Sequence, residues 1–418
     1  MSPINRAAQC FVFLWVALLL SGCTAGPNTA DALPTPALEP SPPTPTSEPA
    51  PYLPASIPPR PAANGWIAFS LNDEDFRADI ADIYLTSLDG TPRRIIGFDG
   101  DGLVQSCPVF SPDGTLLAYG ERAESTGGRN NPTEAAVVIV ALDSSGVPSP
   151  RLRIPAGDMF NEPCPKWSPD GRAVAFLAGD LPALWVAPLV GPPTDYGDLP
   201  CNPGVGCPVA FDWTPDGAAL VFAHWEALRL VPLDGTEPSI LARAASNGDL
   251  KEFFESMSAS PLALTLALGG GWMRVTGSTG SQESAFVRVV NMDHGQVIFE
   301  QTSRVGGFHT PVWSPDGTRI AWSFGDELFV HAIDDAPAVG RQGPWVIEGV
   351  GAPVGLASGV VWSPDGTRLL FVGYAADPYA YAIVSIAADG TDPQVLSPWS
   401  MELYNAGRED LSWQAVDR

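Results

Sequence analysis

Side chains that could act as nucleophiles, bases or metal ligands are scattered along this sequence. Its histidines, His224, His294, His309 and His331, stand far apart, and none belongs to an HExxH motif or another short-range pair. The G-x-S-x-G spacing of a serine hydrolase is absent; the nearest stretch, residues 277–281, has the wrong spacing and is typical of a loop. The sequence therefore predicts no catalytic residue and no cofactor.

One acidic stretch could bind a hard cation. Asp73, Glu74 and Asp75 are followed by Asp79 and Asp82, and carboxylates suit Ca2+. The spacing differs from that of an EF-hand loop, so a solvated acidic loop is the favoured interpretation. We expect no metal site.

Cys23 is the residue with the clearest predicted chemistry. Residues 11–20 are an unbroken apolar run behind Arg6, which is typical of a signal peptide and too short to span a bilayer. Leu20-Ser21-Gly22-Cys23 follows directly and resembles the lipobox of bacterial lipoproteins. The resemblance implies cleavage after residue 22, lipidation of Cys23, and export to the outer face of a bacterial membrane or the periplasmic side of the envelope. An ordinary signal peptide with an incidental cysteine is the alternative.

The four cysteines after Cys23 suggest disulfides, because an even number in an exported chain favours pairing. Cys107 and Cys164 each precede a proline, three residues before equivalent repeat positions. Cys201 and Cys207 flank a short Gly/Pro loop. The favoured pairs are Cys107 with Cys164 and Cys201 with Cys207. A pair of Cys164 with Cys201 or Cys207 remains open.

Three regions follow from composition: a signal peptide (1–22), a tether (23–63) and a folded domain (64–418). The tether is rich in Pro, Thr, Ser and Ala without hydrophobic periodicity, so it is expected to be disordered and extended. At about 3.1 Å per residue it could reach up to ~120 Å. A ligand for a Pro-binding module is the less favoured alternative.

Charge excludes one class of partner. The chain has 47 acidic and 22 basic residues, a formal net charge of −25, which repels phosphate backbones. We therefore expect no nucleic acid partner, and we expect a monomer.

One phrase recurs along residues 64–418 and predicts hairpins. An aromatic residue, Ser/Thr-Pro-Asp-Gly and an apolar strand follow one another from Pro108, Pro165, Phe211, Pro311 and Val360. Proline presets φ, Asp bonds the local backbone and Gly accepts a positive φ, so the phrase encodes a tight turn. Further strands that often end in Asp-Gly follow. Four short antiparallel strands every 50 residues or so predict the blades of a β-propeller, an all-β fold.

The number of aromatic residues that open the repeated phrase, called openers below, predicts seven blades. They stand at the following positions: Phe110, Trp167, Trp213, Trp313, Trp362 and Trp413. The gap from Trp213 to Trp313 is about twice as long as the other gaps between openers. It predicts a degenerate blade that opens at residues 258–262 and has residues 264–268 as its second strand. Residues 65–70 begin at a second strand, so the strand at 411–416 should close the ring. Six blades with residues 245–305 as an insertion is the alternative. The tryptophans are expected to pack blades, not to form a carbohydrate or quinone platform.

The W-S-P-D-G phrase followed by I-A-F resembles the TolB-type, WD-like repeat over nearly all of residues 64–418. Members of that family bind proteins or act as gates before peptidase domains. This chain departs from both patterns, because it has a tether where TolB has an α/β domain and no hydrolase domain follows. The resemblance implies a propeller but leaves function open.

Alternation of strand direction assigns the tight turns to one face. The other connections are expected to be long and irregular, and binding is expected there, around the channel mouth. The candidates on that face are Asp73, Asp75, Arg129, Glu162, Trp225, His309, Tyr379 and Tyr404.

The favoured function is a cell-envelope lipoprotein that binds a protein or another ligand as a scaffold, without catalysis. One alternative is an enzyme of the lyase or lactonase type with its site in the channel. Such a site needs convergent acids, His or a metal, and Asp212 is the one internal acid that the predicted first strands show. Another alternative is a peptidase gate that works with a separate hydrolase.

Overall fold

The computed structural model places the seven predicted sheets in the second of two units, Pro49–Arg418; the first is Met1–Glu48. It describes residues 65–72, 81–88, 93–96, 103–123, 133–143, 146–149, 152–159, 163–179, 183–198, 210–224, 227–276, 279–303, 308–325, 327–334, 340–343, 345, 354–357, 359–376, 379–397 and 411–415. These residues form strands and turns and contain no helix.

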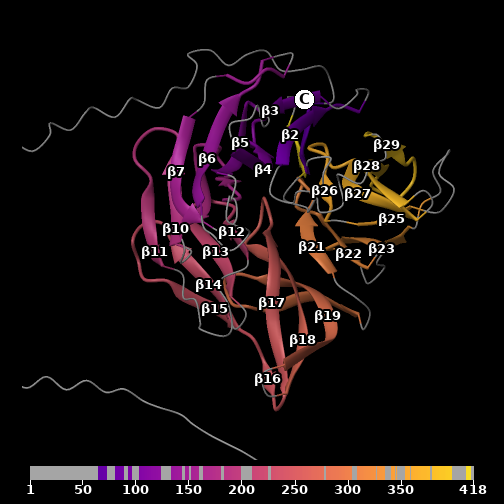
Figure 1. The fold of residues 1–418 in the computed structure, drawn as a ribbon. Coiled ribbons are helices and arrows are strands. Elements are labelled where there is room, and N and C mark those ends of the chain that lie inside the picture. The colour runs from indigo at the N-terminus through magenta and orange to yellow at the C-terminus, as the bar shows by residue number, and fades with distance from the viewer. Residues whose placement is uncertain are drawn as a thin grey trace, which may run out of the picture. The chain divides into compact units, whose positions relative to one another are not determined.

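Seven antiparallel sheets follow one another around a ring, so the fold is a seven-bladed β-propeller (Figure 1). Blade 1 contains β30 (Leu411–Trp413), β1 (Ile67–Asn72), β2 (Ala81–Thr86) and β3 (Arg93–Ile96). Blade 2 contains β4 (Leu103–Phe110), β5 (Leu116–Ala123), β6 (Thr133–Ala141) and β7 (Leu152–Met159). Blade 3 contains β8 (Lys166–Trp167), β9 (Ala173–Ala178), β10 (Ala183–Pro188) and β11 (Thr194–Asp198).

The remaining four blades complete the ring. Blade 4 contains β12 (Ala210–Trp213), β13 (Ala219–His224), β14 (Ala227–Pro232) and β15 (Ser239–Arg243). Blade 5 contains β16 (Ser246–Asn247), β17 (Leu250–Ala259), β18 (Thr265–Thr276), β19 (Thr279–Asn291) and β20 (Val297–Ser303). Blade 6 contains β21 (Phe308–Trp313), β22 (Arg319–Phe324), β23 (Glu327–Ala332) and β24 (Gly340–Gln342). Blade 7 contains β25 (Val354–Leu356), β26 (Val361–Trp362), β27 (Arg368–Ala376), β28 (Tyr379–Ala387) and β29 (Gln394–Val395).

The hydrophobic core lies between blades. Each of seven buried clusters combines side chains of two neighbouring blades, and one of them joins blade 7 to blade 1. Alternate strand residues face opposite neighbours, so each blade contributes to two clusters. The ring of clusters is continuous, so each blade packs against both of its neighbours.

The C-terminal strand closes the ring, as the sequence predicted. Strand β30 pairs antiparallel with β1, with Trp413 opposite Ile67 and Leu411 opposite Phe69. Just beyond it, the Gln414 backbone N–H donates to the Trp66 carbonyl at 2.8 Å, and Gln414 Oε1 accepts the Trp66 N–H at 2.9 Å. Blade 1 is thus built from both ends of the described chain.

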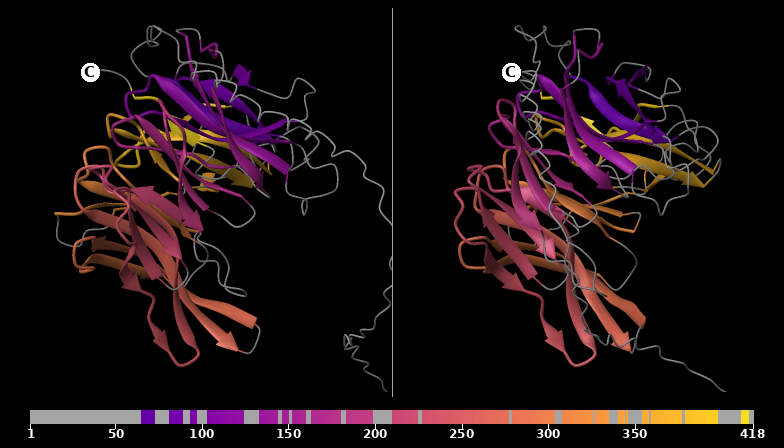
Figure 2. Two further views of the ribbon diagram at one scale, coloured as in Figure 1. Left: turned by 90° about the vertical axis from the view of Figure 1, so that its left-hand side faces the viewer. Right: turned by 60° about the vertical axis from the view of Figure 1, so that its left-hand side comes forward.

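The predicted degenerate blade is a complete sheet. Blade 5 occupies the gap between Trp213 and Trp313, and the turn at residues 260–264 leads into β18 as expected. Its strands β17, β18 and β19 have 10, 12 and 13 residues, longer than those of the other blades. Two further views show these strands extending beyond the neighbouring blades (Figure 2).

The Ser/Thr-Pro-Asp-Gly turns are held by a repeated set of hydrogen bonds. In blade 6, Ser314 Oγ donates to Asp316 Oδ1 at 2.6 Å and accepts the Arg319 N–H at 2.9 Å, while Thr318 donates twice to the same carboxylate oxygen. Gly317 takes a positive φ of 65°. The bond from Ser314 holds the pKa of Asp316 at about 2, and equivalent bonds lower the pKa of Asp170 and Asp216.

These turns predict a loss of stability in acid. A carboxyl pKa that is lower in the folded state stabilises the fold above the unfolded value near 4, and this stabilisation disappears as the pH falls towards 2. The combined variant Asp170→Asn, Asp216→Asn and Asp316→Asn should show a shallower fall in melting temperature between pH 5 and pH 2 than the parent. Thermal melts across that range measure the slope, and identical slopes would contradict this origin of the acid sensitivity.

Connections divide the ring into two faces. The turn face carries the connections of first to second and third to fourth strands, including residues 111–115, 168–172, 214–218, 260–264, 314–318 and 363–367. The loop face carries the others. The expectation that all loop-face connections are long is wrong for blades 4 to 7. In each of these blades only two residues separate the second strand of the regular four from the third, and these are residues 225–226, 277–278, 325–326 and 377–378. The predicted loop from Tyr374 to Ala380 is mostly strand, because β27 and β28 stay paired up to Ala376 and Tyr379.

Candidate functional site

Two of the eight predicted binding residues lie in described strands. His309 is the second residue of β21, opposite Ser323, and Tyr379 begins β28, opposite Ala376. Both positions are strand ends on the loop face. The other six lie outside the described residues, and they are Asp73, Asp75, Arg129, Glu162, Trp225 and Tyr404.

The opening tryptophans connect each inner strand to the preceding blade. An indole Nε1–H donates to a backbone carbonyl in four described cases: Trp167 to Val109 at 3.0 Å, Trp213 to Lys166 at 3.0 Å, Trp313 to Ser258 at 3.0 Å and Trp362 to Val312 at 3.2 Å. Each acceptor directly precedes the opening position of its blade. These rings therefore serve the packing of blades, since their polar atoms and faces are used inside the fold.

In two blades the opening residue is not a tryptophan. There, the backbone N–H of the opening residue donates to a polar side chain of the preceding blade and so joins the two blades. Blade 2 opens with Phe110, whose backbone N–H donates to Ser412 Oγ of blade 1 at 3.0 Å. In blade 5 the equivalent residue is Ala259, whose N–H donates to Asp212 Oδ2 of blade 4 at 2.9 Å. The carboxylate of Asp212 thus performs a structural task at a blade junction.

Asp212 has a second set of contacts within blades 3 and 4. Its Oδ1 accepts the N–H of Trp213 at 3.0 Å and lies 3.8 Å from Lys166 Nζ. The ammonium group also lies 5.5 Å from the centre of the Phe211 ring. Both carboxylate oxygens are therefore engaged across three neighbouring inner strands.

The Asp212→Ala variant should be less stable than the parent by about 1–3 kcal/mol, because the N–H of Ala259 would lose its acceptor at the junction. Asp212→Asn keeps one acceptor oxygen and should lose less. Urea unfolding followed by tryptophan fluorescence compares the two variants. Equal stability of Asp212→Ala and the parent would contradict the junction role.

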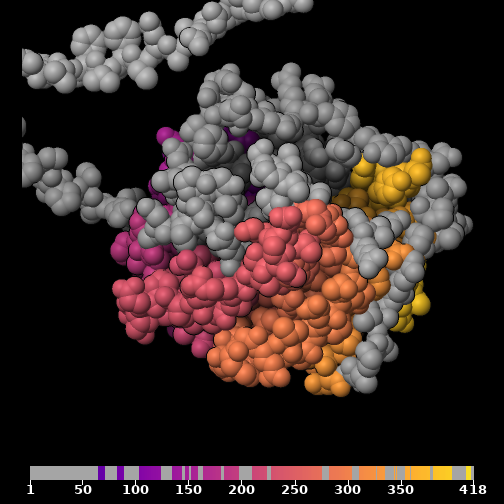
Figure 3. All heavy atoms as spheres, turned by 90° about the horizontal axis from the view of Figure 1, so that it is seen from below, coloured from indigo at the N-terminus to yellow at the C-terminus, as the bar shows by residue number. Residues whose placement is uncertain are grey.

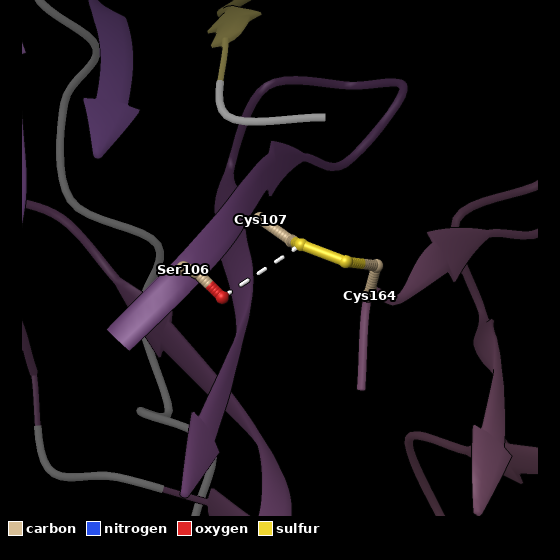
Figure 4. Close-up of a disulfide and its surroundings, with 3 residues drawn as sticks. All are labelled: Ser106, Cys107 and Cys164. Atoms are coloured by element: carbon tan, nitrogen blue, oxygen red, sulfur yellow. Dashed lines mark hydrogen bonds between the residues drawn. A yellow bond between two sulfur atoms is a disulfide. The ribbon is translucent and has the colours of Figure 1, made fainter. Parts of the chain in front are cut away.

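A disulfide joins the inner-strand region of blades 2 and 3. Cys107 Sγ is bonded to Cys164 Sγ, with the Cα atoms 5.2 Å apart, and Ser106 Oγ lies 3.8 Å from the sulfur of Cys107 (Figure 4). This is the pairing that the sequence favoured. Cys107 sits in a β-bulge of β4 with a positive φ of 53°, uncommon for a residue with a side chain. Cys201 and Cys207 lie outside the described residues.

The expectation of a single internal acid is wrong. Strand β17 begins at Leu250, eight residues before the predicted opener, and this adds Glu252 and Glu255 to an inner strand. The adjacent aromatic residues Phe253 and Phe254 favour a strand and could have revealed them. This signal was obscured because the turn of this blade lacks Asp-Gly.

Glu252 is used inside blade 5. Its Oε1 lies 2.8 Å from Arg288 Nη1, and its Oε2 accepts the N–H of Ala245 at 2.7 Å. Arg288 also binds Glu300 at 2.6 Å and stacks on Phe286, with 4.3 Å to the ring centre. Strands β17, β19 and β20 are thereby held in one polar network.

Glu255 and Gln105 are two further polar residues of the inner strands. Glu255 is the extra residue of a β-bulge between Phe254 and Ser256, it is exposed, and desolvation by the surrounding protein raises its pKa. Bulges can aim a side chain away from the regular ladder. The side chain of Gln105 on β4 is fully buried, and neither of its amide atoms has a hydrogen-bond partner. Glu255, which is exposed, is therefore the candidate polar contact on inner strand β17.

Metal sites and membrane-spanning helices are two other features that the described ranges could contain. No set of three or more His, Cys, Asp or Glu side chains gathers there in a way that could hold a metal ion. In those ranges no helix is long and apolar enough to cross a bilayer.

Comparison with known proteins adds little. No family model matches the sequence, and no curated protein matches it. Among solved structures, one similar chain is described as a TolB candidate from Agrobacterium tumefaciens. It is 16% identical, with a TM-score of 0.37, over 63% of this chain and 95% of that chain. A similarity at this level defines neither family nor activity, so the propeller is assigned from the sheets of this chain itself.

Proposed function

We propose that this protein is an exported, lipid-anchored propeller that binds a protein partner on its loop face and does not catalyse a reaction. The observation that carries the proposal is the structural use of Asp212 and Glu252, two of the three acids on the described inner strands. Asp212 and Glu252 each have both oxygens engaged in bonds that hold strands or blades together. A channel enzyme of the lyase or lactonase type would need several such groups free and convergent.

Anchoring is supported by the sequence around Cys23. A lipidated cysteine at residue 23 followed by a Pro-rich stretch would hold the propeller at a distance from a bacterial membrane. Each buried CH2 of an acyl chain contributes about 0.8 kcal/mol, so two or three chains suffice for stable attachment. In this arrangement the closed ring presents a rigid surface outside the membrane.

Binding on the loop face is supported by the difference between the two faces. The described Ser/Thr-Pro-Asp-Gly turns satisfy their own polar groups, as the Asp316 turn shows. Rigid scaffolds generally bind through their more elaborated loops. Blade 5, with its long strands and the exposed Glu255, adds a further feature beside the channel.

Membrane attachment is tested with Cys23→Ser in a bacterial host. The parent should remain in washed membranes and carry a lipidated N-terminal cysteine by mass spectrometry, whereas the variant should lack the lipid. Equal membrane retention and an identical N-terminus in both proteins would contradict the anchor.

Partner binding is tested by crosslinking and pull-down from native membranes. The combined variant His309→Ala, Tyr379→Ala and Tyr404→Ala should weaken the crosslinked complex without lowering the melting temperature. Val147→Ala on the turn face is the matched control, because Val147 is 53% exposed and lies on the other face. A complex that survives the loop-face changes would place docking elsewhere.

A further inference from the structure

The first turn of blade 5 lacks the Asp-Gly pair of its counterparts. Where blade 6 has Ser314-Pro-Asp-Gly-Thr318, blade 5 has Ser260-Pro-Leu-Ala-Leu264. Ser260 keeps the hairpin, since its N–H donates to the Thr265 carbonyl at 2.9 Å as Ser314 does to Arg319 at 2.8 Å. The frame of the turn is therefore preserved while its solvent side has become apolar.

The two leucines of this turn are exposed. Leu262 is 71% exposed and Leu264 is 39% exposed. Leu262 lies beside the first turn of blade 6, because its Cβ is 3.3 Å from the position that a Cβ at Gly317 would occupy. Exposed leucines at an ordered turn add little to folding, since the hydrophobic effect requires burial. Burial against a partner would give them a role.

More exposed apolar residues adjoin this turn. The N–H of Met292 donates to the Leu264 carbonyl at 2.8 Å, which joins the turn to residues 292–296. A Cβ at Gly295 would lie 3.2 Å from the Leu241 carbonyl, which brings blade 4 alongside. We call the exposed set the blade-5 patch, and its members are Ile240, Leu262, Leu264, Val297 and Ile298. Blades 4, 5 and 6 lie side by side, coloured pink to orange, when the molecule is seen from below (Figure 3).

The patch is unusual among the described residues. Seven large apolar side chains of the described residues are exposed. All seven lie at or next to the turn face, and five of them form the patch. The other two, Val147 in blade 2 and Val190 in blade 3, are single residues on separate turns. Contiguous exposed apolar surface with a polar rim is typical of an interaction site, whereas single residues are ordinary.

The rim of the patch is acidic. Exposed carboxylates stand on the turn-face connections of blades 4, 5 and 6, and these are Asp216, Asp234, Glu237, Asp293, Asp316 and Asp334. Hydrogen bonds lower the pKa of Asp216, Asp234 and Asp316, so these groups are ionised at neutral pH. The sequences of the turns 214–218, 233–238, 260–264, 292–296 and 314–318 contain neither Lys nor Arg. A docking surface of opposite charge is favoured by complementarity.

We propose that the blade-5 patch docks a partner protein through a basic amphipathic segment, with apolar side chains over Leu262 and Leu264 and Lys or Arg facing the rim. An anionic membrane surface fits less well, because the carboxylates would oppose it. This second surface lies opposite the loop face and does not depend on the function proposed above.

Restoring the regular turn tests the proposal. The triple variant Leu262→Asp, Ala263→Gly and Leu264→Thr recreates the phrase found in blade 6, so it should fold with a melting temperature equal to or above that of the parent. The control is Val190→Asp, which adds the same charge at a single exposed residue of blade 3 (81% exposed). The purified full-length proteins are titrated with a labelled amphipathic Leu/Lys peptide and with a Leu/Glu peptide of the same pattern.

The parent and Val190→Asp should bind the Leu/Lys peptide with similar affinity, and the triple variant should bind it at least tenfold more weakly. The added Asp can only strengthen attraction to lysine, so such a loss must come from the apolar contact. Equal binding by the triple variant, or equal binding of the Leu/Glu peptide, would overturn the proposal. Cosedimentation with phosphatidylglycerol vesicles that the triple change abolishes would also overturn it, in favour of a membrane surface.

Discussion

A chain ending at residue 410 is expected to lose the cooperative thermal unfolding of the propeller. This truncation removes β30, whose Leu411 and Trp413 are buried in the cluster between blades 7 and 1. Burial of two such side chains contributes roughly 3–6 kcal/mol. It also removes Gln414, whose Nε2–H donates to the Gly114 carbonyl at 2.6 Å. The total is comparable to the net stability of about 5–15 kcal/mol that is usual for folded proteins.

Calorimetry and limited proteolysis distinguish the outcomes. A truncation after Ala415 removes only residues 416–418 and leaves β30 and Gln414 in place. It should melt like the parent and resist protease, whereas the chain ending at residue 410 should be cleaved within blade 1 and show no sharp transition. A truncated protein that melts within a few degrees of the parent would show that the ring closes without its last strand.

The Gly114→Ala variant is expected to lose much more stability than the same replacement at a glycine that has open space at its Cβ position. Gly114 has φ of 68°, and an added Cβ would lie 2.1 Å from the carbonyl oxygen of Ala415 and 3.1 Å from Gln414 Cγ. Since the nearest atom belongs to backbone, the closing segment itself must move. The left-handed conformation costs about 1–2 kcal/mol for a residue with a Cβ, and displacement of the closure adds to this.

Gly325→Ala separates the two contributions. Gly325 has a similar φ of 60°, and nothing lies within 4 Å of an added Cβ there. Its variant should lose only the conformational part, so its melting temperature should fall by less than half as much as that of Gly114→Ala. Equal falls for the two variants would mean that close approach to Ala415 has no energetic weight.

The turns and the number of blades could be predicted because their information is local. Ser314, Asp316 and Gly317 stand within four residues of one another and supply every donor, acceptor and φ that the turn requires. Repetition of that phrase predicted the period, and the incomplete ends at residues 65–70 and 411–416 predicted the closure. Even the blade between Trp213 and Trp313 was found, from the strand that follows its altered turn.

The inner strand of blade 5 and its acids could not be placed by the same reasoning. Strand β17 starts at Leu250 because it pairs with the long strand β18, and the bulge that exposes Glu255 exists only in that pairing. The structural role of Asp212 could not be predicted for a similar reason. Its partner Ala259 is 47 residues away in sequence and becomes a neighbour only when blades 4 and 5 pack.

Sequence alone thus determined the strands, the tight turns, the count of seven and the candidate cysteines, since each depends on residues close together in the chain. Tertiary structure decided which polar groups form hydrogen bonds at blade junctions and that Cys107 pairs with Cys164. It also decided that exposed apolar residues of two blades lie in one patch. These depend on contacts between blades, and such contacts are set by packing around the whole ring, which no local pattern encodes.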